Sequence, residues 1–192
     1  MLSELDAVNT MLSVVGQSPV SSLSVGVSPD VELAKHILRS EKNAVLLRGW
    51  NFNREERELA PDAIGKIRLP EGTLQIDLNP ENYSLIRDYQ ITSRGDYLYN
   101  RKGTTYIFTR NIPVVLTIDL EWRYLPEVFR KYVEARASRI FAERLDADPI
   151  RQRSTQESEY NALAVLQAHE LEDADFTMLN DSNSRYITRR GL

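Results

Sequence analysis

The 192-residue sequence contains no cysteine and only two histidines. Disulfides, thiolate zinc sites and cysteine nucleophiles are therefore excluded. The histidines, His36 and His169, lie far apart in sequence, whereas a metal pair on one helix requires a spacing of three or four residues. The eight glycines are scattered, so the sequence has neither a glycine-rich phosphate loop nor a Gly-x-Ser-x-Gly elbow. We expect no catalytic residues, no metal and no cofactor.

Long apolar runs and an excess of positive charge are also missing. No run approaches the ~20 apolar residues of a membrane span. The N-terminal residues lack the basic flank and apolar stretch of a signal peptide. A net charge of −4 argues against a free-standing DNA-binding domain, which is usually basic. We expect a soluble protein that is made in a cytoplasm and has no membrane partner.

The first and last parts of the chain have the apolar spacing of helices. In residues 1–49, apolar side chains recur at intervals of three and four. Ser3 and Ser28 are expected to cap two helices, and Gly49 is expected to end the second. In residues 126–175 the same spacing predicts two further helices. We expect the two parts to form one helical bundle domain.

The middle of the chain, residues 50–125, has the alternating pattern of strands. Turn-forming residues divide it into short runs, including 50–53, 85–92 and 104–110. We expect an antiparallel β-sheet or meander, inserted between the helical parts as a β-rich domain. Residues 176–192 are expected to be an irregular C-terminal segment. The predicted class is α+β, a helical bundle with an inserted sheet.

The last predicted helix begins with residues 151–159, which are polar on every side of the helix. Such a stretch is either solvated or covered by the polar surface of another chain. Arginine outnumbers lysine by 19 to 5 in the whole sequence, and arginine is well suited to interfaces because it forms bidentate pairs with carboxylates. The candidate subunit-interface residues are Arg151, Arg153, Glu157 and Glu159.

Short motifs along the chain resemble those of one known family. They are Glu4–Asn9, Arg48–Glu56 with Leu59–Asp62, Leu125–Arg130, Ala137–Phe141 and Asp175–Asn180. In their order, their spacing and the total length, they are similar to the tail tubular protein A family. These proteins are head-to-tail adaptors of short-tailed, podovirus-type bacteriophages.

The resemblance implies a structural virion protein without catalytic residues. Members of the family form a ring of twelve copies between the portal protein and the tail nozzle protein, which is of the tail tubular protein B type. Tail fibres attach near that junction, and double-stranded DNA passes through the ring without specific binding. The resemblance also implies a place in the virion tail after synthesis in the bacterial host cytoplasm.

If the chain forms such a ring, one C-terminal cluster is a candidate for lining its hole and another is a candidate for docking to the portal. Twelve copies of a chain with a net charge of −4 carry −48, which would repel DNA phosphates if acidic residues line the hole. The lumen candidates are Glu170, Glu172, Asp173 and Asp175, for which a solvated face is the plain alternative. The portal-docking candidates are Arg185, Tyr186, Ile187, Arg189 and Arg190, for which a frayed terminus is the alternative.

Two other classes of protein stay open at this point. One is a monomeric head-completion protein, or another phage tail structural protein that assembles only on docking. Its size in solution would distinguish it from a ring. The other is an enzyme with a carboxylate site, such as a wall-degrading hydrolase, which requires two coupled acids at a fixed separation. The sequence favours no such pair.

Overall fold

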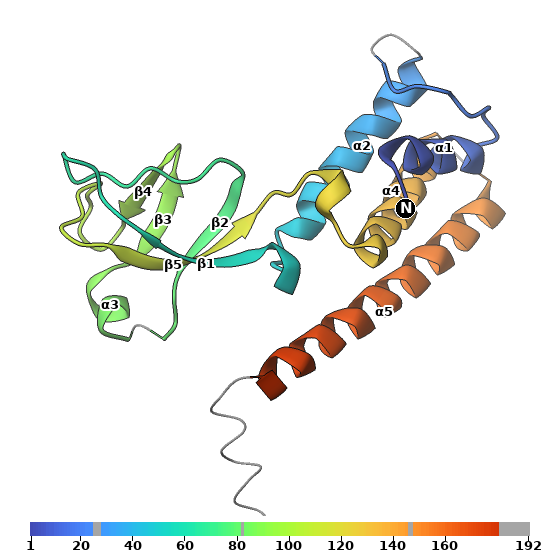
Figure 1. The fold of residues 1–192 in the computed structure, drawn as a ribbon. Helices are drawn as coiled ribbons and strands as arrows, with labels where there is room; N and C mark the ends of the chain where they lie inside the picture. The colour runs from blue at the N-terminus through green and yellow to red at the C-terminus, as the bar shows by residue number, and fades with distance from the viewer. Residues whose placement is uncertain (25–27, 82, 146–147, 181–192) are drawn as a thin grey trace, which may run out of the picture. The chain divides into compact units, whose positions relative to one another are not determined.

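The computed structural model describes residues 1–24, 28–81, 83–145 and 148–180 (Figure 1). It contains both helices and antiparallel strands, which confirms the α+β class. The chain divides into two compact units: a helical unit, Met1–Val45 with Glu121–Leu192, and a strand unit, Leu46–Leu120. Their boundaries lie a few residues before the positions expected from the sequence.

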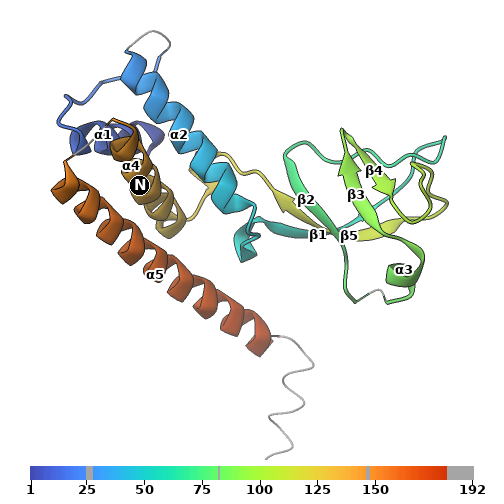
Figure 2. The same cartoon turned by 180° about the vertical axis from the view of Figure 1, so that it is seen from behind.

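The helical unit is built around α4 (Glu127–Arg144), which follows the short turn η2 (Trp122–Tyr124). Both α1 (Glu4–Val14) and α5 (Pro149–Asn180) lie against α4. Figures 1 and 2 show α2 (Pro29–Leu46) packed beside α1 and α4. The buried apolar side chains of these helices, among the described residues, are Ala7, Val8, Met11, Leu12, Val31, Ala34, Ile37, Leu38, Val45, Leu46, Phe129, Tyr132, Val133, Ala137, Phe141, Ala142 and Leu166.

Local capping explains where the first two helices begin and why the chain turns after α2. The Asp6 amide donates to Ser3 Oγ (3.1 Å), and the Ser3 amide donates to Asp6 Oδ2 (3.0 Å). This capping box also lowers the pKa of Asp6, because Ser3 bonds its carboxylate. Ser28 caps α2 through the Val31 amide, and Gly49 adopts a φ of +72° after α2. The three predictions are confirmed.

The strand unit contains a three-stranded antiparallel sheet in the order β1-β5-β2 and the hairpin β3-β4. The sheet strands are β1 (Arg54–Leu59), β2 (Thr73–Leu78) and β5 (Ile112–Ile118), and the hairpin strands are β3 (Ile91–Arg94) and β4 (Tyr97–Asn100). The buried core of this unit is formed by Ile67, Leu69, Ile76, Leu98, Phe108, Ile112, Val114 and Leu116.

The strand order of the larger sheet differs from a meander, in which consecutive strands are neighbours. The last strand, β5, lies in the centre, with Glu56 of β1 opposite Val115 and Ile76 of β2 opposite Leu116. Its nearly continuous apolar sequence requires burial on both faces. The charged sequence of β1 suits an edge, where a strand must not pair with another chain.

Three runs expected to be strands have other structures. Residues 50–53 form the short helix η1 (Asn51–Asn53), and 85–92 divides into α3 (Tyr83–Asp88) and the start of β3. In α3 the Tyr89 amide donates to the Leu85 carbonyl (2.8 Å), a helical i to i+4 bond. Residues 104–110 form turns with isolated bridges, because the chain already reverses between Asn100 and Thr105.

The C-terminal helix is longer than the sequence analysis expected. Helix α5 continues to Asn180, so the prediction of irregular structure from residue 176 is wrong for residues 176–180. The physical reason is that neither glycine nor proline occurs between Pro149 and Gly191, so nothing in the sequence stops the helix near residue 173. Among the described residues, no helix has the length and apolar character needed to cross a membrane.

Candidate interaction surfaces

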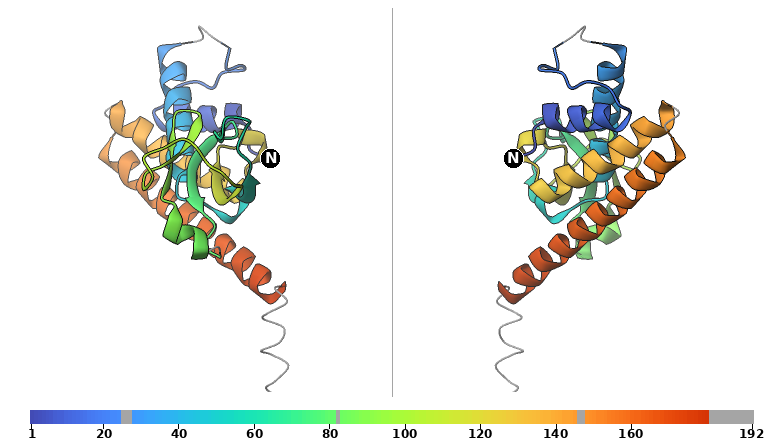
Figure 3. Two further views of the ribbon diagram at one scale, coloured as in Figure 1. Left: turned by 90° about the vertical axis from the view of Figure 1, so that its left-hand side faces the viewer. Right: turned by 90° about the vertical axis from the view of Figure 1, so that its right-hand side faces the viewer.

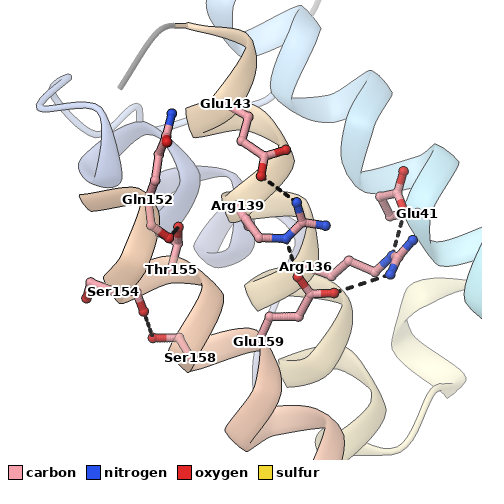
Figure 4. A network of polar contacts seen from close by, with 9 residues as sticks. All are labelled: Glu41, Arg136, Arg139, Glu143, Gln152, Ser154, Thr155, Ser158 and Glu159. Atoms are coloured by element: carbon pink, nitrogen blue, oxygen red, sulfur yellow. Dashed lines mark hydrogen bonds and ion pairs between the residues drawn. The ribbon is translucent and has the colours of Figure 1, made fainter. Parts of the chain in front are cut away.

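An ionic network joins α5 to α4 and α2 within the helical unit (Figure 4). Arg136 Nε lies 2.7 Å from Glu41 Oε2, and Arg136 Nη1 lies 3.2 Å from Glu159 Oε1. Arg139 bonds Glu159 Oε2 through Nε and Glu143 Oε1 through Nη1. The bond with Glu159 raises the pKa of Arg139, against the opposite effect of burial. Only 14% of the Glu159 side chain is exposed, so this carboxylate is the centre of the network.

The four subunit-interface candidates therefore do not share one surface. Glu159 points into its own chain, whereas Arg151, Arg153 and Glu157 are exposed. Arg151 also lies near α1, where its Nη1 is 3.4 Å from the Val14 carbonyl oxygen. The sequence pattern could not reveal the covered side of this stretch, because its buried residues are themselves polar.

The outer face of α5 carries an apolar stripe that the sequence analysis missed. Tyr160, Ala164, Ala168 and Leu171 are all exposed and follow each other at intervals of four, four and three residues. Tyr160 is 73% exposed and Leu171 is 68% exposed, whereas Leu166 on the opposite side is 1% exposed. The spacing was the available signal, because residues three or four apart share a helix face.

The acidic run lies on the second half of the same helix. Glu172 and Asp173 are exposed, and Glu170 is half-buried. Asp173 Oδ2 lies 3.2 Å from His169 Nδ1. The side chain of Asp175 is outside the described part of the structure, as are all five portal-docking candidates, Arg185, Tyr186, Ile187, Arg189 and Arg190. The roles of these residues in the lumen and at the portal stay predictions.

The first residues of the chain are clamped to the helical unit by side chains from η2 and α4. The Leu2 amide donates to both carboxylate oxygens of Glu127, at 3.0 and 3.2 Å. The Leu2 carbonyl accepts from Trp122 Nε1 and from Arg130 Nη1, each at 3.0 Å. Arg130 also pairs with Glu127 (2.9 Å) and is only 3% exposed. The clamp joins residues more than 100 positions apart, so no local sequence pattern indicates it.

A cavity of about 630 Å³ lies beside this clamp, and we call it the N-terminal pocket. It is lined by Arg39 and Lys42 of α2, Trp122 and Arg123 of η2, Arg130, and residues 1–4. The lining includes four cationic side chains and two acidic ones, Glu4 and Glu121. Arg130 Nε has no hydrogen-bond partner among the described residues. The pocket is therefore suited to an anionic group.

Within the described ranges, no group of three or more histidine, aspartate and glutamate side chains could hold a metal ion. A smaller cavity of about 220 Å³ lies among α1, α4 and α5 and is lined by Thr10, Glu134, Ser138 and Thr155, among others. Burial is the main cause that raises the pKa of Glu134, and a hydrogen bond with Thr10 opposes it. No second carboxylate lines this cavity in the described residues.

Glu134 gives a testable pH dependence. Because its folded pKa is raised, the unfolded chain releases the proton first, and stability falls as pH rises from about 4.5 through the folded pKa. We expect Glu134→Gln to raise the melting temperature at pH 7 to 8 and to have little effect near pH 4. Thermal unfolding followed by circular dichroism checks this. The exposed Glu157→Gln is the matched control, and an equal shift at both pH values would contradict the prediction.

Comparison with known proteins shows the family to which the chain belongs. The chain matches the family model described as tail tubular protein over residues 5–176. It is 27% identical over 189 residues to tail tubular protein A of Klebsiella phage KP34, and the match covers 98% of this chain and 97% of that protein. The findings define a structural component of a phage tail that assembles with other tail proteins. The chain belongs to the tail tubular protein family, which confirms the resemblance seen in its motifs.

Proposed function

We propose that this chain is a head-to-tail adaptor that forms a ring between the portal protein and the tail nozzle protein. The proposed ring has twelve copies, as the family resemblance implies, with tail fibres near its nozzle side. DNA passes through the ring without specific binding. The observation that carries the proposal is family membership over residues 5–176, which includes parts of both units.

A closed ring places a physical requirement on the surface of each subunit. Identical subunits that close by rotation use heterologous contacts, so each subunit needs two different faces that fit each other. The helical unit has an exposed apolar stripe on α5 and a separate cationic pocket beside Leu2. A net charge of −4 on each copy would also give the assembled ring a negative field that discourages binding of DNA.

The mass of the protein in solution tests the proposal. We expect light scattering to give a mass near twelve times 22.1 kDa, either for the protein alone or for the copies recruited by its portal protein. The two results would also show whether the assembly energy lies between subunits or at the portal. A protein that stays monomeric with and without the portal would contradict the ring and leave the head-completion class as the better interpretation.

A further inference from the structure

We propose that the second half of α5 is an acidic arm that docks into the N-terminal pocket of a neighbouring copy of this chain. We define the arm as residues 167–180 and the receptor as the N-terminal pocket. This inference rests on the proposed ring and specifies one of its contacts. It also assigns the acidic run to subunit contacts rather than to the channel wall.

The arm extends beyond the helix that supports it. At 1.5 Å per residue, the 32 residues of α5 span about 48 Å and the 18 residues of α4 span about 27 Å. Leu166 is the last residue of α5 that is buried among those whose side chains are described. Figure 3 shows α5 lying along α4 and then continuing past it. The arm, residues 167–180, continues without this support, and helical segments of about 12–15 residues are marginal in water without packing. A partner that covers the arm would therefore stabilise it.

The chemistry of the arm and that of the receptor are complementary. The arm contains Glu170, Glu172, Asp173 and Asp175 and no lysine or arginine. The receptor is predominantly cationic and includes the exposed Arg39. Leu171 on the arm is 68% exposed, and the buried indole of Trp122 forms part of the pocket lining. Carboxylates beside an apolar side chain therefore match cations beside an aromatic ring.

The occupant is a second copy because both surfaces belong to the same chain. Among the described side chains, those that line the pocket come from 1–42 and 121–130, and none of the described side chains of the chain's own arm is among them. An arm that enters the pocket of the next copy makes a head-to-tail contact, and such contacts repeat around a ring. Arg39 is an exposed cation of the pocket, and an incoming carboxylate can therefore reach it.

Charge reversal at two exposed positions tests the contact. Glu172→Lys reverses one of the four negative charges of the arm, and Arg39→Glu reverses one of the four positive charges that line the pocket. We expect each variant alone to weaken assembly roughly tenfold or more, because like charges then meet at the contact. An equal mixture of the two variants should assemble, since the reversed charge at position 172 of one variant can then pair with the reversed charge at position 39 of the other, and the unchanged Glu172 with the unchanged Arg39. The chain with both substitutions should assemble for the same reason. Assembly is measured by light scattering, alone and with the portal.

Matched controls separate the contact from other effects. Glu71→Lys makes the same charge change at an exposed turn of the strand unit and should assemble like the wild type. Circular dichroism checks that every variant is folded. Normal assembly of both single variants would overturn the docking and leave the ring intact, with the acidic run available for the channel wall. Failure of the mixture to recover would also overturn it, as would a loss of portal recruitment that Arg39→Glu causes and Glu172→Lys does not. A wild-type monomer in all conditions would instead overturn the ring itself.

Discussion

Replacing Asn53 with alanine is expected to lower the free energy of unfolding by about 3 kcal/mol. Asn53 is 1% exposed and bonds three backbone groups of the strand unit. Its Oδ1 accepts from the Trp50 amide (2.7 Å), and its Nδ2 donates to the carbonyls of Leu46 and Ile118 (both 3.1 Å). Alanine would remove the side-chain partner of the Trp50 amide and of the Ile118 carbonyl, whereas the Leu46 carbonyl still accepts from the Gly49 amide (3.0 Å). Each buried group left without a partner costs about 1–3 kcal/mol if no water replaces the lost bond.

Urea denaturation of the variant measures this cost. Asn53→Asp retains the acceptor for Trp50 but loses both amide donors, so we expect a loss of comparable size. The exposed Asn111→Ala is the control and should change stability by less than about 0.5 kcal/mol. A loss below about 1 kcal/mol for Asn53→Ala would show that water replaces the amide, and that these three bonds contribute little to stability.

Asn53 also illustrates which parts of the fold the sequence could predict. Helix ends depend on residues within one turn, so Ser3 and Ser28 were sufficient to locate the starts of α1 and α2, and Gly49 the turn after α2. The alternation of Trp50 and Phe52 with asparagines predicted a strand, whereas the Asn53 side chain instead closes a turn. Its partner Ile118 is 65 residues away, and periodicity carries no information about such a contact.

The candidate surfaces also divide into those that follow from local spacing and those that depend on contacts between distant residues. The outer stripe of α5 obeys simple helical spacing and was open to prediction from Tyr160 to Leu171. The N-terminal pocket was not, because it depends on Leu2 meeting Trp122 and Arg130 in the folded chain. Glu159 was assigned to the outside because its neighbours in sequence are polar, and only the packing of α5 on α4 shows its arginine partners.

Replacing Glu159 with alanine is expected to lower the free energy of unfolding by about 2 kcal/mol. Truncation of one member of a buried ion pair costs about 3–5 kcal/mol, because its partner stays buried without a counter-charge. Here Arg136 and Arg139 are 27% and 23% exposed, and each retains a second carboxylate, Glu41 or Glu143. Partial solvation and these remaining pairs reduce the expected cost.

Two further variants test the contribution of Glu159. Glu159→Gln retains the shape and one hydrogen-bond acceptor, so we expect about half of the loss caused by alanine. The exposed Glu157→Ala lies two residues earlier and should change stability by less than about 0.5 kcal/mol. Chemical denaturation at low and at high salt completes the test. The loss caused by Glu159→Ala should change little with salt, because a largely buried network is screened less than surface pairs.

The position of Glu159 connects this stability effect to assembly. Its bonds to two arginines of α4 lie about two turns before Leu166, the last buried side chain before the proposed arm. The network therefore helps to fix the direction in which the arm leaves the bundle. We expect Glu159→Ala to weaken ring formation under conditions in which circular dichroism still shows a folded monomer. Unchanged assembly of this folded variant would show that packing at Leu166 alone directs the arm.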